Sequence, residues 1–160
     1  MAGKASESIT GPKISNYSVK GATLEEVSDA ISGREEAGKV DWKPSYKCAE
    51  GDDGKLSSCT VTVPITMELP KWSPPSGASA AVKKEWERFE KCLRAHEDGH
   101  VDLVKEAFEG LAEKMLEGSK ADAAKTFKQA CDDLQKASDK YDADTDHGMK
   151  KGCTLDVNIT

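Results

Sequence analysis

The sequence predicts an α+β fold in which a small antiparallel sheet packs on a long antiparallel helical hairpin. Two patterns indicate this class. Residues 60–69 alternate between apolar and polar side chains, which is typical of a strand with one buried face. From residue 82 onward, apolar side chains recur every three or four positions, which is the spacing of one helix face. This second pattern continues on both sides of Gly118, which indicates two helices joined by a turn.

The first elements are short. Residues 1–13 are rich in Ser, Gly and Lys, and we expect a disordered lead before a single domain that spans residues 14–160. Alternation over residues 14–20 predicts a strand. Thr23, with Glu26 three positions later, fits a capping box that opens a helix over residues 24–31.

The middle of the chain predicts the rest of the sheet. A weak strand over residues 40–46 is interrupted by Pro44, and a polar loop follows between Cys48 and Cys59. The strongest strand is Thr60–Leu69. Pro64 lies inside it and has no N–H to donate, so we expect either an edge strand or a bulge at that position.

The second half of the chain is expected to be helical. The apolar stripe predicts one long helix over residues 79–116, stopped by Gly118, and a second helix over residues 119–140. The remaining residues predict a loop and a short closing strand over residues 154–159.

Charge and composition exclude some function classes. The 23 Lys and Arg against 29 Asp and Glu give a net charge of −6, and no basic run is concentrated in the sequence. Nucleic-acid binders and peripheral membrane proteins need cationic surfaces to meet phosphates, so both classes are disfavoured. No stretch approaches the ~20 apolar residues of a membrane span. We expect a monomer.

Five scattered cysteines with no CxxC pair indicate one or two disulfides in an exported protein. Residues 1–8 hold no apolar signal segment, so either the protein is cytosolic or a start Met has replaced its signal peptide. The cysteines favour the second alternative, and we expect a secreted or periplasmic protein. Cys48 and Cys59 bracket a short loop and can close it locally. A Cys92–Cys131 bridge is disfavoured, because the hairpin places the two residues too far apart.

The motif that indicates chemistry is HExxH, His96-Glu97-Asp98-Gly99-His100, inside the long predicted helix. Residues four apart lie one turn apart on the same helix face, so His96 and His100 can point at one Zn²⁺ ion. Both occupy the apolar stripe and are expected to face the interior. Glu97 then lies beside the open metal position as the base that activates a metal-bound water.

Zinc needs a third protein ligand. If the helices fold back around Gly118, His100 faces about residue 136 and His96 about residue 140. The segment that follows contains His147, the one remaining histidine of the sequence, which we predict as the third ligand. Asp142 and Asp144 are the alternatives, as ligands or as partners of a ligating imidazole.

Tyr141 ends the apolar stripe of the second helix. A packing role fits this position. A phenol near zinc can also donate a hydrogen bond to the oxyanion that forms when water attacks an amide carbonyl, so Tyr141 is a candidate catalytic residue.

The chain resembles a family of bacterial proteins described as predicted secreted zinc-dependent proteases, a domain of unknown function with HExxH and YDxxTxHG motifs. The resemblance runs from about Tyr17 to Gly152, and its most specific block is Tyr141–Gly148. It implies export and a zincin-like metallopeptidase site on His96, Glu97, His100 and His147. It also implies a cysteine before the strong strand and one in the second helix, which favours a Cys59–Cys131 pair.

The predicted function is therefore zinc-dependent hydrolysis of peptide bonds in a peptide or protein substrate, by a metal-bound water activated by Glu97. We expect an edge strand near the metal, in the position of Thr60–Leu69, to hold the substrate by backbone pairing, although Pro64 would interrupt it. Two alternatives stay open: an exported binding domain that zinc only stabilises, and hydrolysis of another amide such as a cell-wall peptide. Glu97 favours chemistry, because a purely structural zinc site does not need it.

Overall fold

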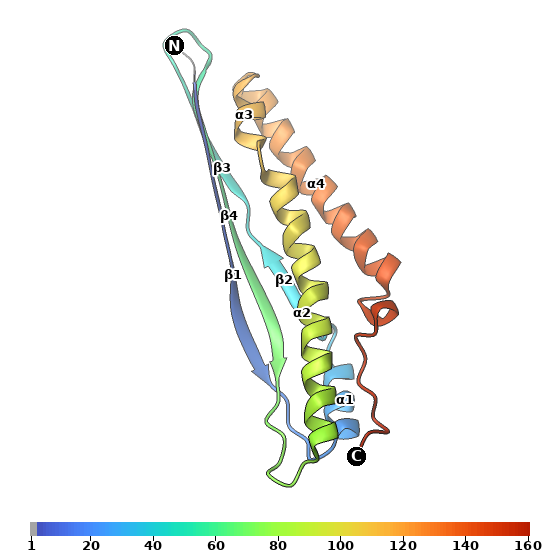
Figure 1. The fold of residues 1–160 in the computed structure, drawn as a ribbon. Coiled ribbons are helices and arrows are strands. Elements are labelled where there is room, and N and C mark those ends of the chain that lie inside the picture. Colours follow the sequence, from blue (N-terminus) through green and yellow to red (C-terminus); the bar gives the residue numbers. More distant parts are fainter. Residues whose placement is uncertain (1–2) are drawn as a thin grey trace.

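The computed structural model describes residues 3–160 and has two layers, a sheet and a set of helices, as the sequence predicts for an α+β fold (Figure 1). In chain order the elements are β1 (Lys4–Ser18), α1 (Leu24–Ser32), β2 (Lys39–Trp42), β3 (Ser45–Glu50), β4 (Leu56–Lys71), α2 (Ala80–Phe108), α3 (Leu111–Leu116), α4 (Lys120–Thr145) and the 3₁₀ turn η1 (Met149–Lys151). Helix α2 runs along the sheet, and α4 returns beside it (Figure 1).

The sheet is mixed, and β4 is its central strand. β1 pairs with one side of β4 in parallel, whereas β2 and β3 pair with the other side in antiparallel orientation. The predictions of a purely antiparallel sheet and of an edge position for β4 were therefore wrong. An irregularity is present at Pro64, but the extra residue is on the partner strand: from the pair Thr10–Pro64 to the pair Lys13–Thr66, β1 advances further than β4.

The predicted disordered lead was wrong for residues 4–13, which belong to β1; residues 1 and 2 lie outside the described part of the chain. These residues are polar and mostly exposed, so they show no apolar signal. Strand pairing uses backbone groups, which every non-proline residue carries, and a long strand alongside β4 needs few apolar side chains.

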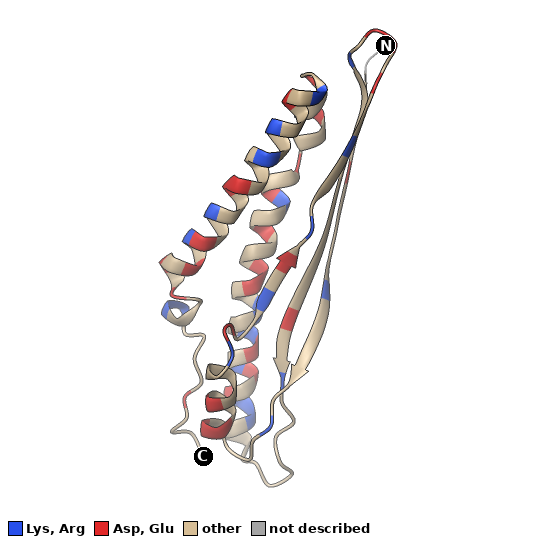
Figure 2. Ribbon diagram, turned by 180° about the vertical axis from the view of Figure 1, so that it is seen from behind, with Lys and Arg blue, Asp and Glu red and all other residues tan. Residues whose placement is uncertain are grey.

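The core lies between β4 and the helices. The predicted inner face of β4 (Val61, Val63, Ile65 and Met67) is buried and packs with side chains of α2 and α3 in one cluster. The opposite face of β4 alternates with it and is exposed at Thr60, Thr62, Pro64 and Thr66, which confirms the predicted alternation. Charged residues of both signs are interspersed along the outer face of α4 (Figure 2).

The predicted long helix is two helices. α2 ends at Phe108, and α3 begins after Gly110, whose φ of 75° is left-handed. The Glu7 carboxylate of β1 accepts hydrogen bonds from the backbone N–H groups of Gly110 (3.1 Å) and Ala112 (2.9 Å). A distant strand thus supplies the cap at this break, which local periodicity does not reveal.

α4 begins with a capping box between Ser119 and Asp122, and it continues to Thr145, past the predicted end at Lys140. This extension places Tyr141 and Asp142 on the helix rather than in a loop. Pro44 separates β2 from β3 within the single strand predicted over residues 40–46. The predicted strand over residues 154–159 does not form.

Of the two disulfides, one joins neighbouring strands and the other joins α2 to the C-terminal segment. Cys48 lies directly opposite Cys59 in the β3–β4 pair and is bonded to it, and Cys92 of α2 is bonded to Cys153. Cys131 is the free cysteine, so the Cys59–Cys131 pair that the resemblance favoured was wrong. No helix within residues 3–160 is both long and apolar enough to cross a membrane.

Candidate metal centre

The two motif histidines lie on the face of α2 that meets α4. Their side chains are buried, with 3 % exposure for His96 and 6 % for His100, and their ring centroids are 5.1 Å apart. The helix places them one turn apart on one face, as the i, i+4 spacing predicts.

Asp142 of α4 lies beside both histidines and is the third member of the group. Its Oδ1 lies 3.0 Å from Nε2 of His96 and 2.9 Å from Nε2 of His100. The ligating atoms of these three residues lie within 4.8 Å of one another, an arrangement that can hold a metal ion. The hairpin argument placed residues 136 and 140 opposite the histidines. The structure places Ser138 and Asp142 there, two residues further along the chain in each case.

His147 is not part of this group of three. Its Nδ1 lies 3.7 Å from Oδ1 of Asp142, and its side chain is 62 % exposed. The backbone of Asp146 and His147 is left-handed, with φ of 49° and 53°, which ends α4 at this point. Asp142 therefore takes the position predicted for His147, and a ligand role for His147 stays a prediction.

In each histidine Nε2 faces Asp142, and the surroundings of Nδ1 affect whether Nε2 can bind a metal. Nδ1 of His100 lies 2.8 Å from Oγ of the buried Ser138, which can accept a hydrogen bond from Nδ1–H and so favour the tautomer whose Nε2 lone pair is free. Nδ1 of His96 is buried without a partner in the described chain. Burial lowers the pKa of His96, so the ring is favoured in its neutral form. Two neutral imidazoles and one carboxylate fit the donor set of a three-ligand zinc site.

Tyr141 supports the histidines by packing. Its ring stacks on His96 with centroids 4.8 Å apart and meets His100 edge-on at 4.8 Å. Its hydroxyl donates to the backbone carbonyl of His96 (3.0 Å). A Cβ on Gly99 would lie 2.3 Å from this hydroxyl oxygen, so the motif carries glycine where the phenol crosses α2. The bond from its hydroxyl to the backbone fits the packing role of Tyr141, and its oxyanion role stays a prediction.

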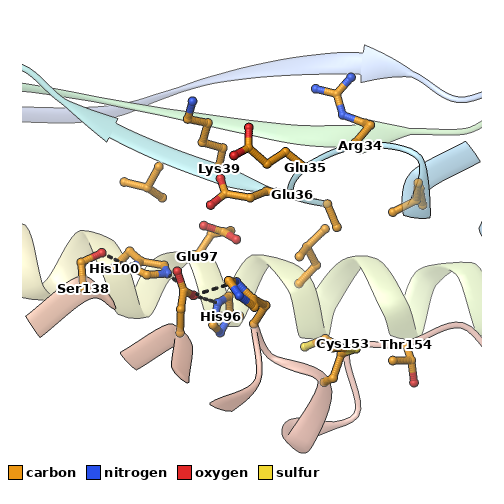
Figure 3. Close-up of a pocket in the computed structure, with 18 of the residues that line it drawn as sticks. Arg34, Glu35, Glu36, Lys39, His96, Glu97, His100, Ser138, Cys153 and Thr154 are labelled. Carbon is orange, nitrogen blue, oxygen red and sulfur yellow. Dashed lines mark hydrogen bonds and ion pairs between the residues drawn. The ribbon is translucent and has the colours of Figure 1, made fainter. Parts of the chain in front are cut away.

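Glu97 points away from α4, toward the segment before β2 (Figure 3). Its side chain is 4 % exposed, and a Cβ on Gly38 would lie 3.0 Å from its Oε1, so the backbone there contacts the carboxylate closely. Burial, with the negative charges of Asp142 and Glu36, raises the pKa of Glu97 to about 8. A cation bound beside it would favour the ionised form again.

The three cluster residues and Glu97 share one cavity of about 610 Å³. Its walls come from α1, the loop of residues 33–38, β2, α2, α4 and the C-terminal segment. Sequence reasoning missed the loop of residues 33–38, because its contact with α2 joins residues far apart in the chain and leaves no periodic signal.

The C-terminal segment, which forms one wall of the cavity, is held against α2 by side chains of the N-terminal half of that helix. Cys153 is bonded to Cys92, and Arg88 donates to the carbonyl of Gly152 (2.7 Å). Glu85 pairs with Arg88 and accepts from the backbone N–H of Asp156 (3.0 Å). This arrangement holds Cys153, Thr154 and Leu155 against the cavity without regular secondary structure.

Comparison with known proteins supports the family and adds no activity. No match was found among curated proteins, and none among solved structures. The model of a family described as bacterial protein of unknown function, DUF922, matches residues 14–148, which include the histidines of α2 and the end of α4. The chain therefore belongs to this bacterial family, DUF922.

Proposed function

We propose that this protein is an exported zinc-dependent peptidase. The observation that carries the proposal is the joint placement of His96, His100 and Asp142 with the buried carboxylate of Glu97 in one cavity. A site that only stabilises the fold has no need of a buried carboxylate outside its ligand set, since that burial costs free energy. Two disulfides and the finding on membrane spans are compatible with an extracellular location.

His96, His100 and Asp142 would hold the zinc ion, with His147 next to them. When bound, zinc supplies a Lewis acid that lowers the pKa of water and polarises a carbonyl. Glu97 would accept the proton of the attacking water and return it to the leaving amine. Its burial keeps this carboxylate away from bulk water, where competing hydrogen bonds would weaken its interaction with the attacking group.

The strand that would hold the substrate is β2 rather than β4. β4 is paired on both sides, whereas β2 pairs with β4 on one side and its residues also line the cavity. An extended peptide can add to the free edge of β2 by backbone hydrogen bonds. Pro64 does not interrupt this pairing, because it belongs to β4.

The test is a Glu97→Gln variant analysed for both metal and activity. We expect about one zinc per chain in wild type and variant, and a loss of peptide hydrolysis on the order of 10²–10⁴-fold in the variant. Elemental analysis gives the metal, and denatured casein or a peptide library with 1,10-phenanthroline as control gives the activity. Equal hydrolysis by both proteins would contradict the role of Glu97. Zinc-loaded wild type that cleaves no peptide would favour the zinc-stabilised binding domain.

A further inference from the structure

The cavity contains more negative charge than its own cations neutralise. Glu35 and Glu36, in the loop between α1 and β2, line it from one side, and Asp139 of α4 lines it from another. None of these three carboxylates belongs to an ion pair of the described residues. They lie in addition to Glu97 and Asp142.

The two basic residues that line the cavity are already engaged. Arg34 pairs with Glu68 at 2.6 Å, and its guanidinium lies 3.5 Å from the centre of the Tyr17 ring. Lys39 lies 3.8 Å from a carboxylate oxygen of Asp41. The negative charge of Glu35 and Glu36, the acidic residues of the loop wall, is therefore available to a ligand.

These carboxylates lie next to the residues that we propose for peptide hydrolysis. Glu35 and Glu36 extend over the stretch of α2 that carries the motif, on the side toward which Glu97 points (Figure 3). Glu36 and Glu97 line the same cavity. Glu97 itself is 4 % exposed, and within residues 3–160 its carboxylate takes part in no ion pair.

A second metal ion is a poorer occupant than an organic cation. Within residues 3–160, the one group of three or more side chains arranged for a metal is His96, His100 and Asp142. Glu35 and Glu36 are exposed and belong to no such group. Carboxylates spread along a wall instead suit an ammonium or guanidinium group on a flexible side chain, which needs no fixed coordination geometry.

Building on the proposed peptidase function, we propose that the substrate is a peptide with a lysine or arginine residue adjoining the bond to be cleaved. The peptide backbone lies along β2, and the basic side chain extends to the wall formed by Glu35 and Glu36. The wall then contributes to specificity by attracting basic side chains and repelling acidic ones.

Binding tests this inference without relying on catalysis. Fluorescently labelled, end-blocked alanine peptides that differ at one central residue (Lys, Arg, norleucine or Glu) are titrated against zinc-loaded Glu97→Gln protein. We expect the Lys and Arg peptides to bind roughly tenfold or more tightly than the Glu peptide, since attraction is replaced by repulsion. The Glu36→Gln change should weaken Lys-peptide binding roughly 2- to 5-fold, the range of a partly exposed ion pair.

Matched controls distinguish an effect of the loop wall from an effect of the overall charge of the protein. Glu50→Gln removes the same charge at the end of β3, outside the residues that line the cavity, and should leave the preference unchanged. Glu36→Lys should reverse the preference toward the Glu peptide. High salt should reduce the preference, because exposed charges are screened.

The outcomes distinguish the two proposals. Cleavage of peptides by wild type without a basic preference would overturn this inference and leave the peptidase function standing. A basic preference in binding without any cleavage would support the inference and overturn the peptidase function. Equal binding of Lys, norleucine and Glu peptides would overturn the inference. So would two metal ions per chain with one lost in Glu36→Gln, which would assign the wall to a cation site.

Discussion

Replacing Gly99 with alanine should destabilise the protein, although the same change usually stabilises a helix. In a helix interior, Gly→Ala is expected to gain about 1 kcal/mol. Here the new Cβ would lie 2.3 Å from the Tyr141 hydroxyl oxygen and 2.6 Å from its Cζ, so the ring has to move. Overpacking of this kind costs roughly 1–3 kcal/mol, and the lost hydrogen bond from Tyr141 to the His96 carbonyl costs about 1 kcal/mol more.

The sum is a net loss of about 1–3 kcal/mol in the free energy of unfolding of the Gly99→Ala variant. For a chain of this size, that corresponds to a Tm decrease of roughly 2–4 °C per kcal/mol. Zinc affinity should fall as well, because the displaced ring packs on both His96 and His100. Urea denaturation and zinc titration of the purified variant give both quantities.

Two further variants make this test specific. Gly77→Ala adds a Cβ that would meet nothing within 4 Å, so its stability should stay within about 0.5 kcal/mol of wild type. In Gly99→Ala combined with Tyr141→Phe, the closest clash is removed, and part of the loss should be recovered. A Gly99→Ala protein as stable as wild type, or more stable, would refute the contact between Tyr141 and α2 on which this reasoning depends.

Other substitutions test the metal group, the disulfides and the C-terminal wall. Asp142→Ala should lose stoichiometric zinc in elemental analysis, whereas His147→Ala should retain most of it; the reverse result would make His147 the third ligand. Replacing the Cys92–Cys153 pair by serines should cost about 4 kcal/mol in guanidinium denaturation, against about 3 kcal/mol for the Cys48–Cys59 pair, because the two bridges close separations of 61 and 11 residues; a larger loss for the shorter loop would contradict this ranking. The pKa of Glu85 is lowered mainly by the hydrogen bond from its arginine partner, so its contribution to stability is present above about pH 4.5 and is lost as the pH falls through its folded value. Urea unfolding of wild type and Glu85→Gln should therefore differ at neutral pH and converge in acid, and a difference that persists in acid would count against the ion pair.

Local patterns in the sequence were sufficient for much of the fold and half of the candidate site. Alternation predicted the buried face of β4, because successive side chains of a strand point to opposite faces. The i, i+4 spacing predicted that His96 and His100 share one face of α2 and are buried. The capping residues Thr23 and Ser79 begin α1 and α2 where the sequence analysis expected those helices to begin.

Only the tertiary structure decided what depends on contacts between distant residues. The place of β4 in the sheet follows from its pairing with β1, whose first ten residues, 4–13, gave no strand signal. The choice of Asp142 over His147 depends on where α4 ends and on the position of the hairpin turn, and each residue of helix rotates the side chain by about 100°. Gly38 packs against Glu97, and Glu36 lines the same cavity, because of how the loop before β2 folds; a loop has no periodic sequence pattern that could predict this. Periodicity reports one element at a time, whereas a site is formed by several elements together, so its third ligand and its walls appear only when those elements are packed.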